Sequence, residues 1–456
     1  MTFLEGVTSV HLVGVGGAGM SGLAKILAQS GHTVSGSDIK GGPAFSRLHA
    51  VGVECWAGHR PDRAREWDLV VASSAVPEDR DPELLAAKAA GIEVWERPAL
   101  LAEMTRSMPA LGLSGSHGKT TSSALTVAAL RALGRDPSFM VGGQLVDLNT
   151  NAHLGERDLF VLEADEAYGT FLDLTLDGFV VTSIEPDHLN YYRTFDRVEE
   201  AFRDVARRCG GPVVVCLDDA GSARLARDVE SVTYGTHEEA DWRILEPRHD
   251  GPSVRFTLEH GGDRWPVSVS RPGLHIARNA TGVLALLGEL GMDVETAAEG
   301  LSSFAGVRRR FEVRARLEGI TVIDDYAHHP TEIAATIAAA RLGEPQRIVA
   351  IFQPHHFWRT ADLATEFGEA MRGADVAIVA GIYAPGEPPI PGVTSRLIAD
   401  AAESQDTLVR YVPRRIDLAP AVAEEARPGD LVLFMGAGDI TLAPDELATL
   451  LAGRSR

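Results

Sequence analysis

The sequence is poor in cysteine and contains no long apolar run. Its 456 residues include three cysteines (Cys55, Cys209 and Cys216), and their spacing matches no metal-binding motif. Scarce cysteine fits a reducing compartment, so we expect a cytoplasmic protein. No run reaches the about 18 apolar residues that a membrane-spanning helix needs. The N-terminal stretch lacks the basic and apolar segments of a signal peptide, so we expect neither membrane insertion nor secretion.

Positive charge is also scarce. The chain has 43 Lys and Arg against 64 Asp and Glu, which gives a net charge of −21. A sequence-independent grip on nucleic acid or anionic lipid needs a basic face, so we expect neither as a partner. The net charge does not exclude a local basic pocket that binds a phosphorylated small molecule. The sequence is compatible with a monomer and with a homodimer.

Three stretches of the chain alternate short apolar runs with helical patterns. This rhythm is typical of α/β domains built on parallel sheets, and the length suits about three such domains. We expect domains at 1–106, 107–312 and 313–456. The first and third are predicted to be Rossmann-like, and the second to be a P-loop-type domain with a central parallel sheet.

The first glycine-rich loop, "GVGGAG" at 14–19, lies between a predicted strand and a predicted helix. With Asp38 about twenty residues further on, it matches the fingerprint of a dinucleotide-binding loop. The glycines allow a pyrophosphate close to the backbone, and the carboxylate suits a ribose hydroxyl. NAD(P), another nucleotide such as a UDP-sugar, and a purely structural turn all remain open. A dehydrogenase is therefore one candidate function.

The second glycine-rich loop, "LSGSHGKTT" at 113–121, keeps the chemistry of a P-loop but has Leu113 where the first glycine is expected. In such a loop, backbone N–H groups surround phosphate oxygens, Lys119 reaches the phosphates, and the Thr120 hydroxyl can bind Mg²⁺. A helix start that binds nothing is the alternative. That alternative is disfavoured because G-K-T-T follows a predicted strand and opens a predicted helix.

Two acidic clusters follow later strands of the same predicted domain. "EADE" at 163–166 and "EPDH" at 185–188 end predicted parallel strands, where ligands collect in an open α/β sheet. Each cluster alone is more typical of a solvated turn. In a P-loop domain the two together predict a magnesium site.

These motifs and several later ones occur in the order found in a known family. "GVGGAGMSGLA", "SGSHGKTT", "EADE", "EPDH", "GVRRRFE", "DDYAHHPTE", "FQPH" and "GAGD" closely resemble the Mur ligases over essentially the whole chain. The resemblance implies one domain each for a UDP-sugar, ATP and an amino acid. It also implies ATP-dependent joining of L-alanine to the lactyl carboxylate of UDP-N-acetylmuramate through an acyl phosphate, in peptidoglycan precursor synthesis.

The motifs and the resemblance together assign expected roles to individual residues. The UDP-sugar is expected to face Gly14, Gly16, Gly17, Ala18, Gly19, Met20, Asp38, Ser73 and Ser74. ATP is expected to contact Gly115, Ser116, His117, Gly118, Lys119, Thr120, Thr121, His275, Asn279 and Arg309. Mg²⁺ is expected at Thr120, Glu163 and His188, and the amino acid at Tyr326, His328, His355 and Arg359. The catalytic residues are expected to be Lys119, His188, His328 and Arg310, with His328 as base or orienting group for the amine.

The chain departs from the family pattern near the expected substrates. It has "FQPHHF" where the family often has "FQPHRY", so His356 replaces an arginine, and Tyr168 follows "EADEA". Glycine or serine in place of L-alanine therefore remains an alternative. A zinc site at the paired histidines, a nucleic-acid contact at "GVRRRFE" and a catalytically dead UDP-sugar-binding protein are further, disfavoured alternatives.

Overall fold

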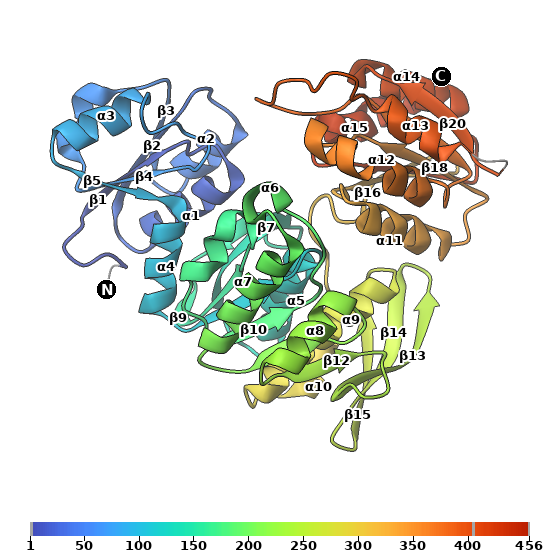
Figure 1. The fold of residues 1–456 in the computed structure, drawn as a ribbon, viewed down its shortest axis with the longest axis horizontal. Helices are drawn as coiled ribbons and strands as arrows, with labels where there is room; N and C mark the ends of the chain where they lie inside the picture. The colour runs from blue at the N-terminus through green and yellow to red at the C-terminus, as the bar shows by residue number, and fades with distance from the viewer. Residues whose placement is uncertain (1–2, 404–405, 455–456) are drawn as a thin grey trace. The chain divides into compact units, whose positions relative to one another are not determined.

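The computed structural model describes residues 3–403 and 406–454 and contains three β-sheets with helices packed on them (Figure 1). The chain forms two compact units. The first extends to Glu246 and adds Phe256–Ser268 and Arg278–Ala305, and the second contains Pro247–Arg255, Val269–Ala277 and the chain from Gly306 onward. The expected α/β fold class is confirmed, whereas the boundaries at 106 and 312 stay predictions.

The first sheet is parallel throughout, with strand order β3-β2-β1-β4-β5. Its strands are short and apolar, as buried parallel strands are. All its strands end at one edge, so the loops that follow β1, β2, β4 and β5 lie near one another. The elements are β1 (Ser9–Val13), α1 (Ala18–Gln29), β2 (Thr33–Asp38), α2 (Pro43–His49), β3 (Glu54–Ala57), η1 (Pro61–Glu66), β4 (Leu69–Ala72), α3 (Pro82–Ala89), β5 (Glu93–Glu96) and α4 (Arg97–Ser107).

The second sheet has ten strands in the order β15-β14-β13-β12-β11-β10-β6-β9-β7-β8. Strand β6 lies between β9 and β10, and both pairings are parallel. The loop after β6 therefore lies between the ends of the two strands that carry the acidic motifs. The strands are β6 (Ala110–Ser114), β7 (Pro137–Leu145), β8 (Thr150–His153), β9 (Glu156–Glu163), β10 (Gly178–Val181), β11 (Val213–Cys216), β12 (Val232–Gly235), β13 (Trp242–Asp250), β14 (Ser253–His260) and β15 (Asp263–Val269). The helices are α5 (Lys119–Ala132), η2 (Ala167–Asp173), α6 (Leu189–Tyr192), α7 (Phe195–Arg208), α8 (Ala220–Asp228), α9 (Leu274–Glu289) and α10 (Val294–Leu301).

The third sheet has the order β16-β17-β21-β18-β19-β20, with an antiparallel edge strand β16 on an otherwise parallel sheet. Apolar side chains fill both of its faces, in two separate core clusters. The strands are β16 (Glu312–Leu317), β17 (Ile320–Asp325), β18 (Arg347–Phe352), β19 (Val376–Ala380), β20 (Leu408–Val412) and β21 (Asp430–Met435). The helices are α11 (Pro330–Arg341), α12 (Phe357–Met371), α13 (Arg396–Ala402), η3 (Arg415–Asp417), α14 (Leu418–Glu425), η4 (Asp439–Leu442) and α15 (Ala443–Arg454).

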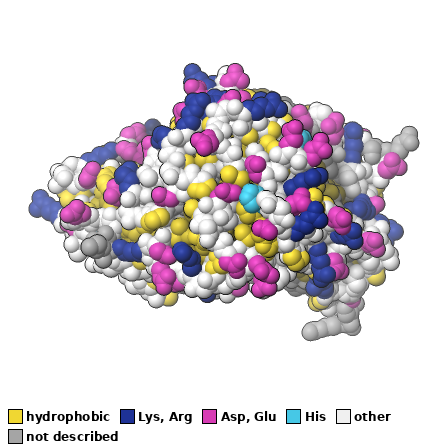
Figure 2. All heavy atoms as spheres, turned by 90° about the horizontal axis from the view of Figure 1, so that it is seen from below, with side chains coloured by type: hydrophobic (Ala, Val, Ile, Leu, Met, Phe, Trp, Pro, Cys, Tyr) yellow, Lys and Arg dark blue, Asp and Glu magenta, His cyan; other side chains and the backbone are white. Residues whose placement is uncertain are grey.

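The surface carries both signs of charge. On the face drawn in Figure 2, acidic side chains are interspersed with Lys and Arg. Within residues 3–403 and 406–454, no helix combines the length and the apolar character that crossing a membrane requires.

Candidate functional site

The loop after β6 is shaped by two glycines that cannot be replaced easily. Gly115 has φ +130°, and a Cβ there would lie 2.2 Å from Thr182 Oγ1. Gly118 has φ +84°, and its Cβ would lie 2.7 Å from Asn279 Oδ1. L-residues avoid these φ values, so glycine is needed at both positions. Leu113 is an ordinary buried residue of β6, which explains the missing glycine: the turn begins only at Gly115.

Hydrogen bonds to the segment after β10 hold this loop. Ser116 N–H donates to the Ser183 carbonyl at 2.9 Å, and His117 N–H donates to Ser183 Oγ at 3.1 Å. In return, Glu185 N–H donates to Ser116 Oγ at 2.8 Å. The loop is therefore fixed before any ligand arrives, as a phosphate cradle requires.

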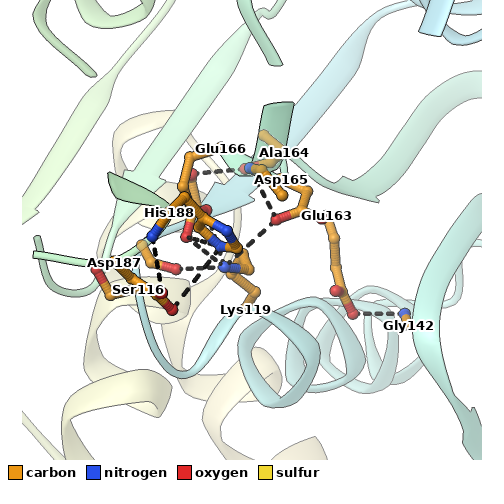
Figure 3. A network of polar contacts seen from close by, with 12 residues as sticks. Ser116, Lys119, Gly142, Glu163, Ala164, Asp165, Glu166, Asp187 and His188 are labelled. Atoms are coloured by element: carbon orange, nitrogen blue, oxygen red, sulfur yellow. Dashed lines mark hydrogen bonds and ion pairs between the residues drawn. The ribbon is translucent and has the colours of Figure 1, made fainter. Parts of the chain in front are cut away.

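Lys119 opens α5 and lies among carboxylates (Figure 3). Its ammonium donates to the Gly115 carbonyl and to both carboxylate oxygens of Glu166, each at 2.8 Å, and lies 3.6 Å from Asp165 Oδ1. The Glu166 side chain is only 2% exposed. Burial alone would lower the pKa of Lys119, but the charges of Glu166 and Asp165 outweigh it and raise that pKa. The ammonium is therefore charged at neutral pH.

The residues predicted to bind magnesium come from separate elements around this loop. His188 Nε2 lies 3.8 Å from Glu166 Oε1 and 3.8 Å from Asp187 Oδ2. At the end of β9, the Glu163 carboxylate accepts the Gly142 N–H, and Thr120 is buried in the first turn of α5. Carboxylate, hydroxyl and imidazole donors fit a hard cation that also keeps waters and phosphate oxygens.

The whole "EADE" motif was predicted to contribute to a magnesium site, but only Glu163 was given an individual role. The contacts of Asp165 and Glu166 with Lys119 were not predicted. Their position in the motif was the only signal. Which of the acids turns back toward Lys119 depends on the backbone after β9, and the sequence pattern does not reveal it.

In the first sheet, the residues of the dinucleotide-binding fingerprint lie together at the edge where the parallel strands have their carboxyl ends. Gly16 N–H donates to Asp38 Oδ2 at 3.0 Å, and a Cβ on Gly14 would lie 2.9 Å from Ser73 Cβ. Gly17 is the N-cap of α1 and has no side-chain cap. The Met20 side chain is buried in the core, so only its backbone is available to a ligand. The predicted residues Ala18, Gly19 and Ser74 belong to the same two segments.

The second unit brings together the residues predicted to hold the amino acid. The Tyr326 and His328 rings are 5.3 Å apart, and the Arg310 guanidinium lies 5.0 Å from the Tyr326 ring centre. Burial lowers the pKa of His328 to about 4. The Glu332 carboxylate, 3.3 Å from Nδ1, acts in the opposite direction, whereas the positive charges of Arg359 and Arg310 add to the effect of burial. The pKa of His355 is lowered to about 3 by burial and by its neighbours His356, His328 and Arg359. Both imidazoles are therefore neutral at pH 7.

The tautomer of His328 follows from its contacts. Its Nδ1 lies 3.1 Å from the Tyr326 carbonyl oxygen, which only accepts hydrogen bonds. The proton of the neutral ring is therefore on Nδ1, and Nε2 carries the lone pair.

Two further contacts of the second unit were not foreseen. The Arg309 guanidinium donates to the Gly436 carbonyl at 2.6 Å and lies 3.7 Å from Asp324. Arg309, which was predicted to contact ATP, is thus held by residues of the second unit. His356 Nδ1 lies 3.0 Å from Glu387 Oε2. Glu387 also accepts N–H groups at the start of α12 and thus caps that helix. His275 lies in the first turn of α9, four residues before Asn279.

Three family models match consecutive parts of the chain. They are the Mur ligase family catalytic domain at residues 9–108, the Mur ligase middle domain at 113–287 and the Mur ligase glutamate ligase domain at 309–438. The chain belongs to the Mur ligase family.

Individual relatives of this ligase match over nearly the full length. It is 43% identical to the UDP-N-acetylmuramate–L-alanine ligase of Sorangium cellulosum, over 98% of this chain and 97% of the other. It is 42% identical to the enzyme of the same name from Myxococcus xanthus, over 97% and 95%. The crystal structure of UDP-N-acetylmuramate–alanine ligase MurC from Thermotoga maritima superposes with a TM-score of 0.84 at 27% identity, covering 98% of this chain and 100% of that one.

Proposed function

We propose that this ligase uses ATP to join L-alanine to the lactyl carboxylate of UDP-N-acetylmuramate and releases ADP and phosphate. The observation that carries the proposal is the 43% identity over 98% of the chain to a relative of that name. The phosphate-binding loop with its partly buried Lys119 supports it. A dehydrogenase would leave this second loop unused, so we set that alternative aside.

The first step overcomes the low reactivity of a carboxylate. Transfer of the γ-phosphoryl group of ATP to a lactyl oxygen makes an acyl phosphate, in which phosphate is a good leaving group. The carboxylate and the triphosphate are both anionic, so positive charge must screen them. In our proposal Lys119 supplies it from the loop and exchanges part of its contact with Glu166 for phosphate oxygens. The bound Mg²⁺, held by Thr120, Glu163 and His188, would add charge neutralisation.

The second step is attack of the amine on the acyl-phosphate carbon, which forms a tetrahedral oxyanion. Collapse of this oxyanion breaks the bond to phosphate, and the departing phosphate takes up the proton that the amine loses. The amine must carry a lone pair, and its N–H must be directed as the oxyanion forms. His328 offers the Nε2 lone pair as an acceptor for that N–H. Since its pKa is lowered to about 4, His328 is too weak a base to hold the proton at pH 7. Of the two roles foreseen, we therefore favour orientation of the amine. Arg359 would bind the amino-acid carboxylate.

Phosphate release from ATP tests the assignment. The assay contains UDP-N-acetylmuramate, Mg²⁺ and L-alanine, glycine or L-serine in turn. We expect phosphate release only when the sugar nucleotide and an amino acid are both present. The highest kcat/KM is expected with L-alanine. A higher kcat/KM with glycine or serine would support the ligase chemistry but change the assigned amino acid. The replacement of an arginine by His356 would then be the first candidate cause. No turnover with any of them, in folded protein, would overturn the substrate assignment.

A further inference from the structure

The loop assigned to the sugar nucleotide has no formal positive charge among its predicted contacts. All of these residues are neutral except Asp38, which is acidic and accepts the Gly16 N–H. The start of α1 supplies only the partial charge of its N–H groups, equivalent to about half an elementary charge. A pyrophosphate bound there carries formal negative charge, so a cation beside the loop would strengthen its binding.

Arg97 lies beside this loop. It follows β5, as Ser73 follows β4 and Gly14 follows β1, so it belongs to the same edge of the sheet. A Cβ on Gly19 would lie 2.4 Å from Arg97 Nη1. The guanidinium therefore packs directly on the first turn of α1, and a side chain at position 19 would displace it.

The Arg97 side chain is half-buried. Across residues 3–403 and 406–454, it forms no ion pair with a carboxylate.

We propose that Arg97 binds the pyrophosphate of UDP-N-acetylmuramate, an inference that rests on the proposed function. A guanidinium presents its N–H groups in a planar fork that matches phosphate oxygens. Arg97 is thereby the cation that complements the backbone N–H groups of the glycine loop.

Calorimetric titration with two ligands tests this role. UDP has the diphosphate but no lactyl group, whereas UDP-N-acetylmuramate has both. We expect Arg97→Ala to raise the Kd of both ligands by about 10- to 100-fold, the effect of losing a charge-assisted hydrogen bond. Arg97→Lys should recover part of the affinity, and KM for ATP should stay unchanged. The matched control is Arg106→Ala, an exposed arginine of the same helix that pairs with Glu103.

The outcomes separate the possible explanations. Unchanged UDP binding in Arg97→Ala overturns the proposal. A loss confined to UDP-N-acetylmuramate also overturns it, in favour of a contact with the N-acetylmuramyl sugar or its lactyl group. If Arg97→Ala does not fold, Arg97→Gln replaces it, and binding equal to that of Arg97→Lys overturns the proposal. Wild-type protein that binds UDP but not UDP-N-acetylmuramate would refute the proposed function and leave the diphosphate contact testable with UDP alone.

Discussion

Lys119 and His328 are both partly buried, and burial lowers the pKa of each, yet their neighbouring charges lead to opposite results. Lys119 enters its site together with Glu166 and Asp165, so its charge is balanced and its pKa rises. His328 has one carboxylate neighbour, Glu332, but burial and the positive charges of Arg359 and Arg310 outweigh it, so the charged form is disfavoured and the pKa falls. One site is built to keep a cation and the other to keep a neutral imidazole. The two halves of the proposed reaction need this division, since phosphoryl transfer requires positive charge and amine attack requires a free lone pair.

Removing the cation should have the largest effect. We expect Lys119→Met to lower kcat by about 10³-fold or more, the scale of losing one cationic contact in phosphoryl transfer. Phosphate release measures it, with Lys88→Met, an exposed lysine paired with Glu78, as control. The substitution also leaves Glu166 as an unpaired buried charge, so the Lys119→Met, Glu166→Gln double variant should regain thermal stability without activity. A double variant that regains activity would contradict the role of Lys119.

Changing His328 should separate the two steps. His328→Asn is expected to lower the rate of L-alanine ligation by about 10- to 100-fold, because the acceptor that orients the amine is lost. Acyl-phosphate formation, trapped as a hydroxamate with hydroxylamine, should stay near the wild-type rate. His237→Asn, an exposed histidine of the first unit, is the control. If the rates of ligation and of hydroxamate trapping fell equally, His328 would act in the first step. The assignment of one reaction step to each cluster would then be wrong.

These two clusters also show what the sequence could and could not predict. Lys119 and Thr120 were predictable because a P-loop is local, with its chemistry in consecutive residues. The Glu166 contact depends on β9 lying beside β6, which only the folded sheet reveals. Arg97 lies about eighty residues from its glycine loop and belongs to no motif. The neutral state of His328 depends on burial and on arginines from two other segments.

A smaller effect is expected at the predicted metal ligand. Glu163→Gln should raise the Mg²⁺ concentration for half-maximal activity by about tenfold, since a charged oxygen ligand becomes neutral. A Mg²⁺ titration at saturating ATP measures the change, and excess Mg²⁺ should restore most of the rate. Glu156→Gln, an exposed residue of the same strand, is the control. An unchanged Mg²⁺ dependence would remove Glu163 from the metal site.

The smallest effect concerns stability in acid and comes from the neutral histidines. The folded-state pKa of His355 is about 3, below the ordinary value of 6.5, so the unfolded chain binds the proton more readily. Folding stability should therefore be complete above about pH 7 and fall as the pH drops from 6.5 toward 3. At pH 5 this histidine should cost on the order of 1–2 kcal/mol.

His355→Gln removes that titration while keeping a polar side chain. Its thermal midpoint should fall less than that of the wild type between pH 7 and pH 5, although other groups titrate in both proteins. Asp325 acts in the opposite sense, because burial raises its pKa to about 6, and it is common to both. The difference between the two pH profiles therefore isolates His355. Parallel profiles would mean that His355 is protonated in the folded protein near its ordinary pKa, and the contrast with the Lys119 cluster would then rest on His328 alone.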